Sequence, residues 1–131
     1  MGFFGVKAAQ PGRGSSKRSG DAFEEIALRH LLRAGMRLVT RNYRTPGRGG
    51  GEIDLVMRDA DGTLVFVEVR ARSGLGHGGA AASVGALKRG RIVFAARHYL
   101  ARYAAPPPCR FDVVAYDGHG VTWLRAAFDA A

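Results

Sequence analysis

The chain has 131 residues, 47% of them hydrophobic, and a formal net charge of +9. This length allows one domain with a modest core and excludes a second domain. The single cysteine, Cys109, excludes an intramolecular disulfide and a cysteine-based metal cluster, and no apolar run reaches the length that spans a membrane. We therefore expect a cytoplasmic protein with no membrane partner.

The charge is distributed unevenly along the chain. Lys and Arg outnumber Asp and Glu by ten to three in residues 1–50 and by eight to three in residues 71–131, but residues 51–70 contain two basic and five acidic residues. A basic surface attracts polyanions, whereas the acidic segment repels phosphate unless a cation lies between them. This pattern favours a nucleic acid as partner, with a metal-assisted step at the acidic segment. The alternative is that the high arginine content, 17 residues against three lysines, raises the charge everywhere.

Residues 1–19 are rich in glycine, serine and basic residues, which predicts a flexible basic arm before a domain that spans residues 20–131. The first helix is predicted over residues 21–34, with Asp21 and Glu24 as a capping box. Glu24 lies at the edge of the apolar face of this helix. Its carboxylate can either reach inward to a site or cap the helix N-terminus.

Basic residues follow in the first predicted strand, residues 36–44, and in the glycine-rich loop after it. Arg41, Arg44 and Arg48 are expected to contact phosphate, because a guanidinium group donates two parallel hydrogen bonds to phosphate oxygens. Tyr43, which lies among them, can stack on an unpaired base or pack as a half-buried strand residue. The sequence leaves both interpretations of Tyr43 open.

The acidic segment, residues 51–70, predicts a β-hairpin in which alternate side chains share a face. With a three-residue loop that ends in a left-handed glycine, Asp54 lies opposite Glu68. Glu52 then lies opposite Arg70. Two opposed carboxylates repel each other, so one must have a raised pKa or a cation must lie between them. Carboxylate oxygens suit Mg²⁺ or Mn²⁺ better than zinc.

Two alternatives to this metal site remain. A two-residue loop would shift the register by one residue and place Asp54 and Glu68 on opposite faces. Otherwise the acidic face is an ordinary solvated surface, on which Glu52 and Arg70 form an ion pair.

A glycine-rich segment, residues 73–82, predicts a mobile loop, and residues 83–103 predict a second helix. Lys88 and Arg91 fall within the apolar stripe of that helix instead of opposite it. They either extend to the edge of the stripe, as cations in a packing face usually do, or reach toward an anionic site.

Strands are predicted at residues 110–116 and 121–125, joined by the turn Asp-Gly-His-Gly. The order of elements is therefore helix, three strands, helix, two strands. This order predicts a single-domain α/β fold in which a mixed β-sheet is flanked by α-helices.

Two sequence strings, GEIDL at 51–55 and VFVEV at 65–69, are highly specific when they occur together. With them the chain resembles the YraN family of small uncharacterised bacterial proteins, which are similar to the Holliday-junction resolvases of the PD-(D/E)XK nuclease superfamily. The resemblance covers roughly residues 20–128. Further matching positions are Glu24, Ala27, Leu31, Gly35, residues 41–44, Arg72, Lys88 and residues 110–114.

This resemblance implies a restriction-endonuclease-like fold in which Glu24, Asp54 and Glu68 bind a divalent metal, Mg²⁺ or Mn²⁺. The main-chain carbonyl of Val69 is implied as a further ligand. Where the superfamily has a lysine two residues after the strand glutamate, this chain has Arg70. Arginine stays protonated and cannot act as a general base, but it can hold a phosphate and stabilise charge.

The leading hypothesis is a divalent-metal-dependent endonuclease that acts on DNA, branched or single-stranded, and forms a homodimer that suits a junction. Arg70 then either clamps the phosphate or marks lost catalysis, and Lys88, the only lysine outside residues 1–19, can supply the missing ammonium. The alternatives are a non-catalytic nucleic-acid-binding module that retains the nuclease fold and an adaptor that docks another protein. The predicted nucleic-acid contacts are Arg41, Arg44, Arg48, Arg72, Lys88 and Arg91.

Overall fold

The structure is a computed structural model that describes residues 15–71 and 84–130. Within these residues the chain forms two helices and five strands. In chain order they are α1 (Ser15–Arg33), β1 (Arg37–Arg44), β2 (Glu52–Arg58), β3 (Leu64–Ala71), α3 (Ala86–Leu100), β4 (Cys109–Tyr116) and β5 (Val121–Phe128). Neither helix is long and apolar enough to cross a membrane.

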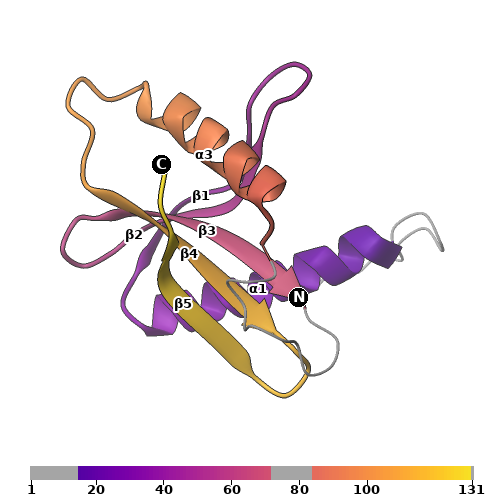
Figure 1. Cartoon of the computed structure of the whole chain (residues 1–131). Coiled ribbons are helices and arrows are strands. Elements are labelled where there is room, and N and C mark those ends of the chain that lie inside the picture. The colour runs from indigo at the N-terminus through magenta and orange to yellow at the C-terminus, as the bar shows by residue number, and fades with distance from the viewer. Residues whose placement is uncertain (1–14, 72–83, 131) are drawn as a thin grey trace.

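All five strands belong to one sheet, in the order β1, β2, β3, β4, β5. β3 and β4 run parallel, because α3 carries the chain back between them, and all other neighbours are antiparallel. α1 covers one face of the sheet and α3 covers the other (Figure 1). The predicted single α/β domain with a mixed sheet is confirmed, and the arrangement is consistent with a restriction-endonuclease-like fold.

Side chains of the central strand β3 alternate between two hydrophobic clusters. Val65 and Val67 pack under α1 with Leu31. Phe66 packs under α3, where its ring centroid lies 6.0 Å from that of Tyr99. These strand residues are fully buried because a helix covers each face of the sheet.

The hairpin between β2 and β3 has the register that the three-residue loop predicts. The strands pair from Arg58 with Leu64 to Leu55 with Val67. Gly62 has a φ of +92°, the left-handed conformation expected at the end of this loop. The alternative with a two-residue loop is therefore wrong.

The pairing between β2 and β3 ends at Leu55 and Val67, one pair before Asp54 would face Glu68. Beyond this point the Asp54 carboxylate accepts a hydrogen bond from the backbone N–H of Val69, at 2.8 Å. A side chain thus replaces the backbone of β2 where the two strands separate.

Glu52 does not face Arg70. Its carboxylate lies 3.4 Å from Nε of Arg44, because β2 remains paired with β1 after it has left β3. Arg70 instead lies 3.6 Å from Glu68 on its own strand, and Glu68 is buried. The predicted ion pair on a solvated hairpin face is therefore wrong.

Near the point where β2 leaves β3, the side chains of both β1 and β2 switch from one face of the sheet to the other. Ile53 packs under α3, but Leu55, two residues later, packs under α1, whereas a regular strand would place them on one face. On β1, Tyr43 packs under α3 and Arg41 contacts α1. Asn42 lies between them with a φ of +52°, which asparagine adopts more readily than most residues. This irregularity in β2 directs the side chain of Asp54 toward β3.

α1 begins at Ser15, six residues before the predicted start. Asp21 and Glu24 therefore lie inside the helix, and the predicted capping box is wrong. Lysine and arginine favour helix interiors and a glycine costs only about 1 kcal/mol there, so no strong signal stops the helix at residue 20. Residues 1–14 lie outside the described residues, so the flexible arm stays a prediction for them.

The second helix, α3, is shorter than predicted, because it ends at Leu100. Tyr103 N–H donates to the Leu100 carbonyl at 3.0 Å, a bond over three residues that closes a tight final turn. In contrast, β5 continues to Phe128, three residues beyond the prediction. The predicted loop at 73–82 falls outside the part of the chain that the structure describes.

Gly51, the first residue of the GEIDL string, packs directly on the backbone of α3. A Cβ atom added to Gly51 would lie 1.9 Å from the carbonyl oxygen of Arg91 and 3.2 Å from Cβ of Ala95. Only glycine allows this approach, which holds the loop before β2 against the helix.

We expect Gly51→Ala to lower the free energy of unfolding by about 1–3 kcal/mol, because α3 must shift to accept the methyl group. Urea denaturation measures this change. The matched control is Gly90→Ala on α3, where an added Cβ meets nothing within 4 Å and should raise stability by up to about 1 kcal/mol. Equal effects of the two substitutions would contradict the close approach at Gly51.

Candidate metal centre and nucleic-acid interface

Glu68 on β3 is a deeply buried acid, with 3% of its surface exposed. Its Oε2 atom lies 3.6 Å from Nζ of Lys88 and 3.6 Å from Nη1 of Arg70. Its Oε1 atom is buried, and no hydrogen-bond donor of the described residues reaches it. One carboxylate oxygen thus faces two cations, and the other has no donor.

The neighbouring Asp54 carboxylate changes the ionisation of Glu68. Burial first, and Asp54 second, raise the pKa of Glu68 to about 8, although Lys88 and Arg70 oppose the shift. The pKa of Asp54 is also raised by burial, against the effect of the hydrogen bond from Val69. Burial and like charge therefore outweigh the two cations, and the pair retains a proton at neutral pH unless another cation binds.

Glu24 on α1 faces Asp54. Its Oε1 atom is buried and lacks a hydrogen-bond partner within the described ranges. Burial, followed by the carboxylates of Asp54 and Asp21, raises the pKa of Glu24 to about 7. Arg41 lies 4.0 Å away and only partly offsets this. These contacts fit the predicted role in which the Glu24 carboxylate reaches inward to a site, and not the role of capping the helix N-terminus.

A cavity of about 410 Å³ lies between α1 and the ends of β1 and β2. Its lining includes Asp21, Glu24, Glu52 and Asp54, so we name it the acidic cavity. Glu68 does not line this cavity, but it contacts Asp54, which does.

The acids do not form a closed cluster. Across residues 15–71 and 84–130, no group of three or more His, Cys, Asp or Glu side chains is arranged to hold a metal ion. The donor set nevertheless fits Mg²⁺ or Mn²⁺ chemically, because it consists of carboxylate oxygens and leaves Oε1 of both Glu24 and Glu68 without a donor. The Val69 carbonyl stays a predicted ligand, since Val69 meets the site through its N–H group.

A second cavity, of about 390 Å³, lies between the loop at 45–51 and α3. Three cations line it, Arg44, Lys88 and Arg91, together with Glu52 and loop glycines, so we name it the basic cavity. Arg44 and Glu52 line both cavities and form the ion pair between them. The acidic and basic cavities are therefore neighbours.

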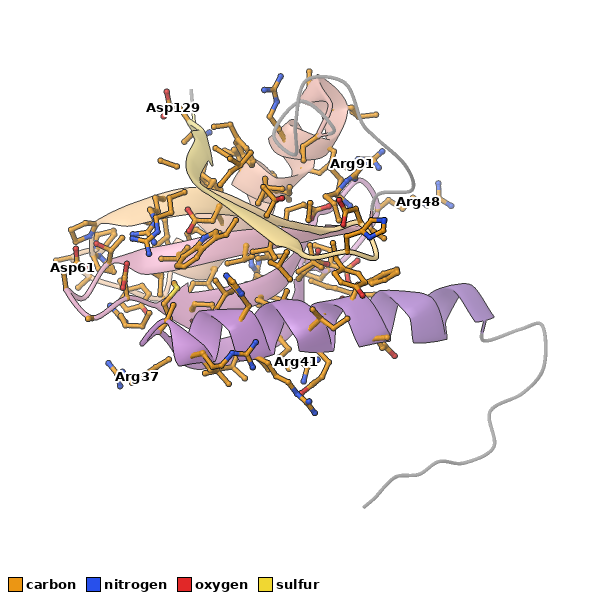
Figure 2. The ribbon with its side chains drawn as sticks, turned by 90° about the horizontal axis from the view of Figure 1, so that it is seen from below. Arg37, Arg41, Arg48, Asp61, Arg91 and Asp129 are labelled. Carbon is orange, nitrogen blue, oxygen red and sulfur yellow. The ribbon has the colours of Figure 1, made fainter. Side chains whose placement is uncertain are left out.

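The other predicted nucleic-acid contacts do not join this group. Arg41 lies beside α1, where it pairs with Glu25 at 3.4 Å, and Arg48 points away from the molecule (Figure 2). The physical reason is that Glu24 and Glu25 on α1 attract Arg41, at 4.0 Å and 3.4 Å, whereas Arg44 pairs with Glu52. Arg72 lies outside the described residues.

Tyr43 packs as a half-buried strand residue. Its ring meets Tyr99 edge to face, with 5.2 Å between centroids, and its hydroxyl group hydrogen-bonds to Nδ1 of His98. The guanidinium group of Arg102 lies 5.6 Å from the ring centroid. These contacts favour the packing interpretation over base stacking. Sequence reasoning missed His98 and Arg102, which fall on α3 and directly after it.

One further buried acid, Asp112 on β4, is fully paired and structural. It accepts hydrogen bonds from Nε1 of Trp123 at 2.9 Å, from the backbone N–H of Ala126 at 2.9 Å and from Nε of Arg110 at 3.0 Å. Ala126 has a φ of +51°, and the pairing of β4 with β5 is irregular at this point. Asp112 therefore stabilises an irregular edge strand and leaves no free oxygen for a metal.

Comparison with known proteins decides the family of the chain. Residues 23–116 match the model of "Uncharacterised protein family UPF0102". The chain belongs to this family. The matched residues include Glu24, Asp54, Glu68 and Lys88. The predicted membership of the YraN family is confirmed, because UPF0102 is that family.

Several relatives in the UPF0102 family span nearly the whole chain. The UPF0102 protein of Paracidovorax citrulli (strain AAC00-1) is 61% identical over 134 residues, which cover 99% of each chain. That of Acidovorax sp. (strain JS42) is 59% identical over 133 residues and covers 100% of each. That of Albidiferax ferrireducens is 66% identical over 117 residues, which cover 89% of this chain and 91% of the relative.

The buried carboxyl pair predicts a pH-dependent stability. The folded chain keeps a proton on Glu68 up to pH about 8, whereas the unfolded chain releases it near pH 4.5. The folded state therefore binds more protons within this window, and Glu68 makes stability fall as pH rises through it. Glu68→Gln, which stays neutral, should gain stability relative to the parent chain as pH increases from 5 to 8. Urea midpoints in chelator-treated buffer measure this difference.

The exposed neighbour of Glu24 provides the control for this pH series. Glu25→Gln, at a residue paired only with arginines on the surface, should follow the pH profile of the parent chain. Parallel profiles for Glu68→Gln and the parent chain would show that Glu68 is ionised in the fold.

Proposed function

We propose that this chain is a divalent-metal-dependent endonuclease that hydrolyses phosphodiester bonds in DNA. One observation carries the proposal: Oε1 of Glu24 and Oε1 of Glu68 are both buried without donors, and Asp54 raises the pKa of both groups. Burying carboxylate oxygens that accept no hydrogen bond is costly. Carboxyl groups with strongly raised pKa values cluster at functional sites, where a bound cation can offset the free-energy cost of burying them.

In this proposal the acids are metal ligands. Asp54 and Glu68 hold Mg²⁺ or Mn²⁺, Glu24 binds it directly or through water, and the Val69 carbonyl is a further ligand. The bound ion supplies a water molecule of lowered pKa and neutralises charge on the phosphate. Binding displaces the proton of Glu68, so metal affinity rises with pH up to about 8.

Lys88 and Arg70 have separate roles. The Lys88 ammonium reaches Glu68 from α3, so a lysine lies beside the strand glutamate although position 70 is arginine. Lys88 orients the attacking water or a phosphate oxygen. Arg70, which keeps its charge, holds the scissile phosphate and stabilises the negative charge that develops on it.

The basic residues around the site support DNA as the substrate. The chain carries a net charge of +9, and three cations line the cavity beside the acids. Branched or single-stranded DNA, a two-fold homodimer that matches a junction, and a cytoplasmic location are parts of this proposal.

A second candidate is a non-catalytic nucleic-acid-binding module that retains the nuclease fold. Arg70 favours it, because an arginine cannot replace a lysine that activates water. This candidate predicts DNA binding that weakens with salt but no metal-dependent cleavage. An adaptor that docks another protein would have little affinity for DNA at physiological salt.

Cleavage assays test the leading candidate. Labelled branched, single-stranded and duplex DNA is incubated with the protein and Mg²⁺ or Mn²⁺. We expect Asp54→Ala and Glu68→Ala each to lower the cleavage rate at least about 100-fold, because each removes a metal ligand. Glu25→Ala is the matched control and should retain the rate. Cleavage that survives both ligand substitutions would refute the assigned site.

Thermal melting gives a readout that is independent of activity. A metal bound only by the folded chain must raise the melting midpoint, and Glu68→Ala should remove this rise. An unchanged midpoint at millimolar Mg²⁺ and Mn²⁺ would favour the non-catalytic candidate.

The role of Lys88 can be separated from that of Arg70. Lys88→Ala should lower the cleavage rate about 100-fold or more, as the loss of one electrostatic contact to the reacting group typically does. Arg89→Ala is the matched control, because Arg89 lies on the side of α3 that faces β5 and the C-terminal residues. A rate that falls in Arg70→Lys but persists in Lys88→Ala would assign the catalytic cation to position 70.

A further inference from the structure

The basic cavity is built from two separate parts of the chain. Arg44 comes from the end of β1, and Lys88 and Arg91 come from the first two turns of α3. The one acid in its lining, Glu52, is already paired with Arg44 at 3.4 Å. The cavity therefore has an excess of positive charge, which suits an oxyanion.

The loop at 45–51 forms the other wall of the basic cavity. Hydrogen bonds fix its ends, and its middle contains glycines without side chains. Thr45 and Gly51 close it, since Thr45 N–H donates to the Gly51 carbonyl at 3.0 Å and Gly51 N–H donates to Oγ1 of Thr45 at 2.7 Å. Gly47 and Gly49 have φ values of +82° and +70°, and a Cβ atom on either would meet nothing within 4 Å. A ligand can thus approach the loop backbone closely, as phosphate groups do in glycine-rich loops.

The first turn of α3 brings no negative charge to the cavity. No acidic residue lies in its first turn, and Gly85 provides no side-chain cap. The charges of Lys88 and Arg91 are therefore not offset by an acid at the start of their own helix.

The position of the cavity relates it to the carboxylates. Lys88 lines the cavity and also lies 3.6 Å from Glu68, while the Arg44–Glu52 ion pair is shared with the acidic cavity. A phosphate in the basic cavity would therefore lie beside one at the acids.

We propose that the basic cavity is a phosphate-binding subsite that holds the phosphate adjacent to the scissile one. This inference rests on the proposed function, since it places the cavity relative to the cut. The same chemistry accepts an internal phosphate of a strand or a terminal 5′-phosphate.

Binding without metal tests the subsite separately from cleavage. Fluorescence anisotropy with a labelled single-stranded oligonucleotide in EDTA should show that Arg91→Ala weakens binding about tenfold, as the loss of one charged hydrogen bond does. The slope of log K against log salt should fall by about 0.7 for one lost phosphate contact. Arg89→Ala, two residues away on the same helix, removes the same charge and should change affinity less than about twofold, and Arg91→Lys should recover most of the loss.

Inorganic phosphate provides a direct probe. In ¹⁵N-resolved NMR spectra, titration with phosphate should shift the amide signals of Gly47 and Gly49 saturably, and Arg91→Ala should abolish saturation. Oligonucleotides with a 5′-phosphate or a 5′-hydroxyl then distinguish the two sources. Tighter binding of the phosphorylated form assigns the cavity to a strand end, and equal binding assigns it to an internal phosphate.

The outcomes separate this inference from the proposed function. If Arg91→Ala and Arg89→Ala bind the oligonucleotide equally, or phosphate shifts no loop glycine saturably, the subsite is wrong even when DNA is cut. If Arg91→Ala loses affinity but the parent chain does not cleave DNA, the subsite stands as part of a binding module, and the endonuclease is wrong.

Discussion

One hydrogen bond, from the Val69 N–H group to the Asp54 carboxylate, determines how the site is built. It joins β2 to β3 at the point where their backbone pairing ends. Because a side chain makes this connection, β2 can leave the central strand and remain beside β1. The resulting gap brings the carboxylates of Asp54 and Glu68 together under the start of α3, and Glu24 faces Asp54 from α1.

Burial dominates the electrostatics of this gap. Two cations lie within 3.6 Å of Glu68, yet its pKa is raised, because the desolvated carboxyl group also faces Asp54. The protein therefore carries unfavourable negative charge inside a strongly basic surface. Such an arrangement lowers stability and is retained where function requires it. A net charge of +9 also gives the chain a positive field, which attracts polyanions in general.

The mixed sheet and the register of the β2–β3 hairpin could be predicted from the sequence, because both depend on local signals. The turn before Gly62 and the order of the elements are enough to predict them. Sequence reasoning failed where strands stop being regular, since assigning faces by parity assumes an unbroken period of two. The left-handed Asn42 breaks that period, so Arg41 and Tyr43 lie on opposite faces of the sheet. Glu52 pairs with Arg44 instead of Arg70, because β2 stays beside β1 after it has left β3. The contact between Lys88 and Glu68 joins residues 20 positions apart, and only the packing of α3 on the sheet shows it.

The GEIDL string makes two contacts at a fixed separation. Its first residue, Gly51, touches the backbone of α3, and its fourth, Asp54, binds the backbone of β3. Three residues of extended chain span about 10 Å and resist stretching. The main chain thus acts as a spacer between the helix that lines one cavity and the strand that carries Glu68. Side-chain substitutions can change the lining of either cavity, but this short stretch of backbone fixes how far apart the helix and the strand lie.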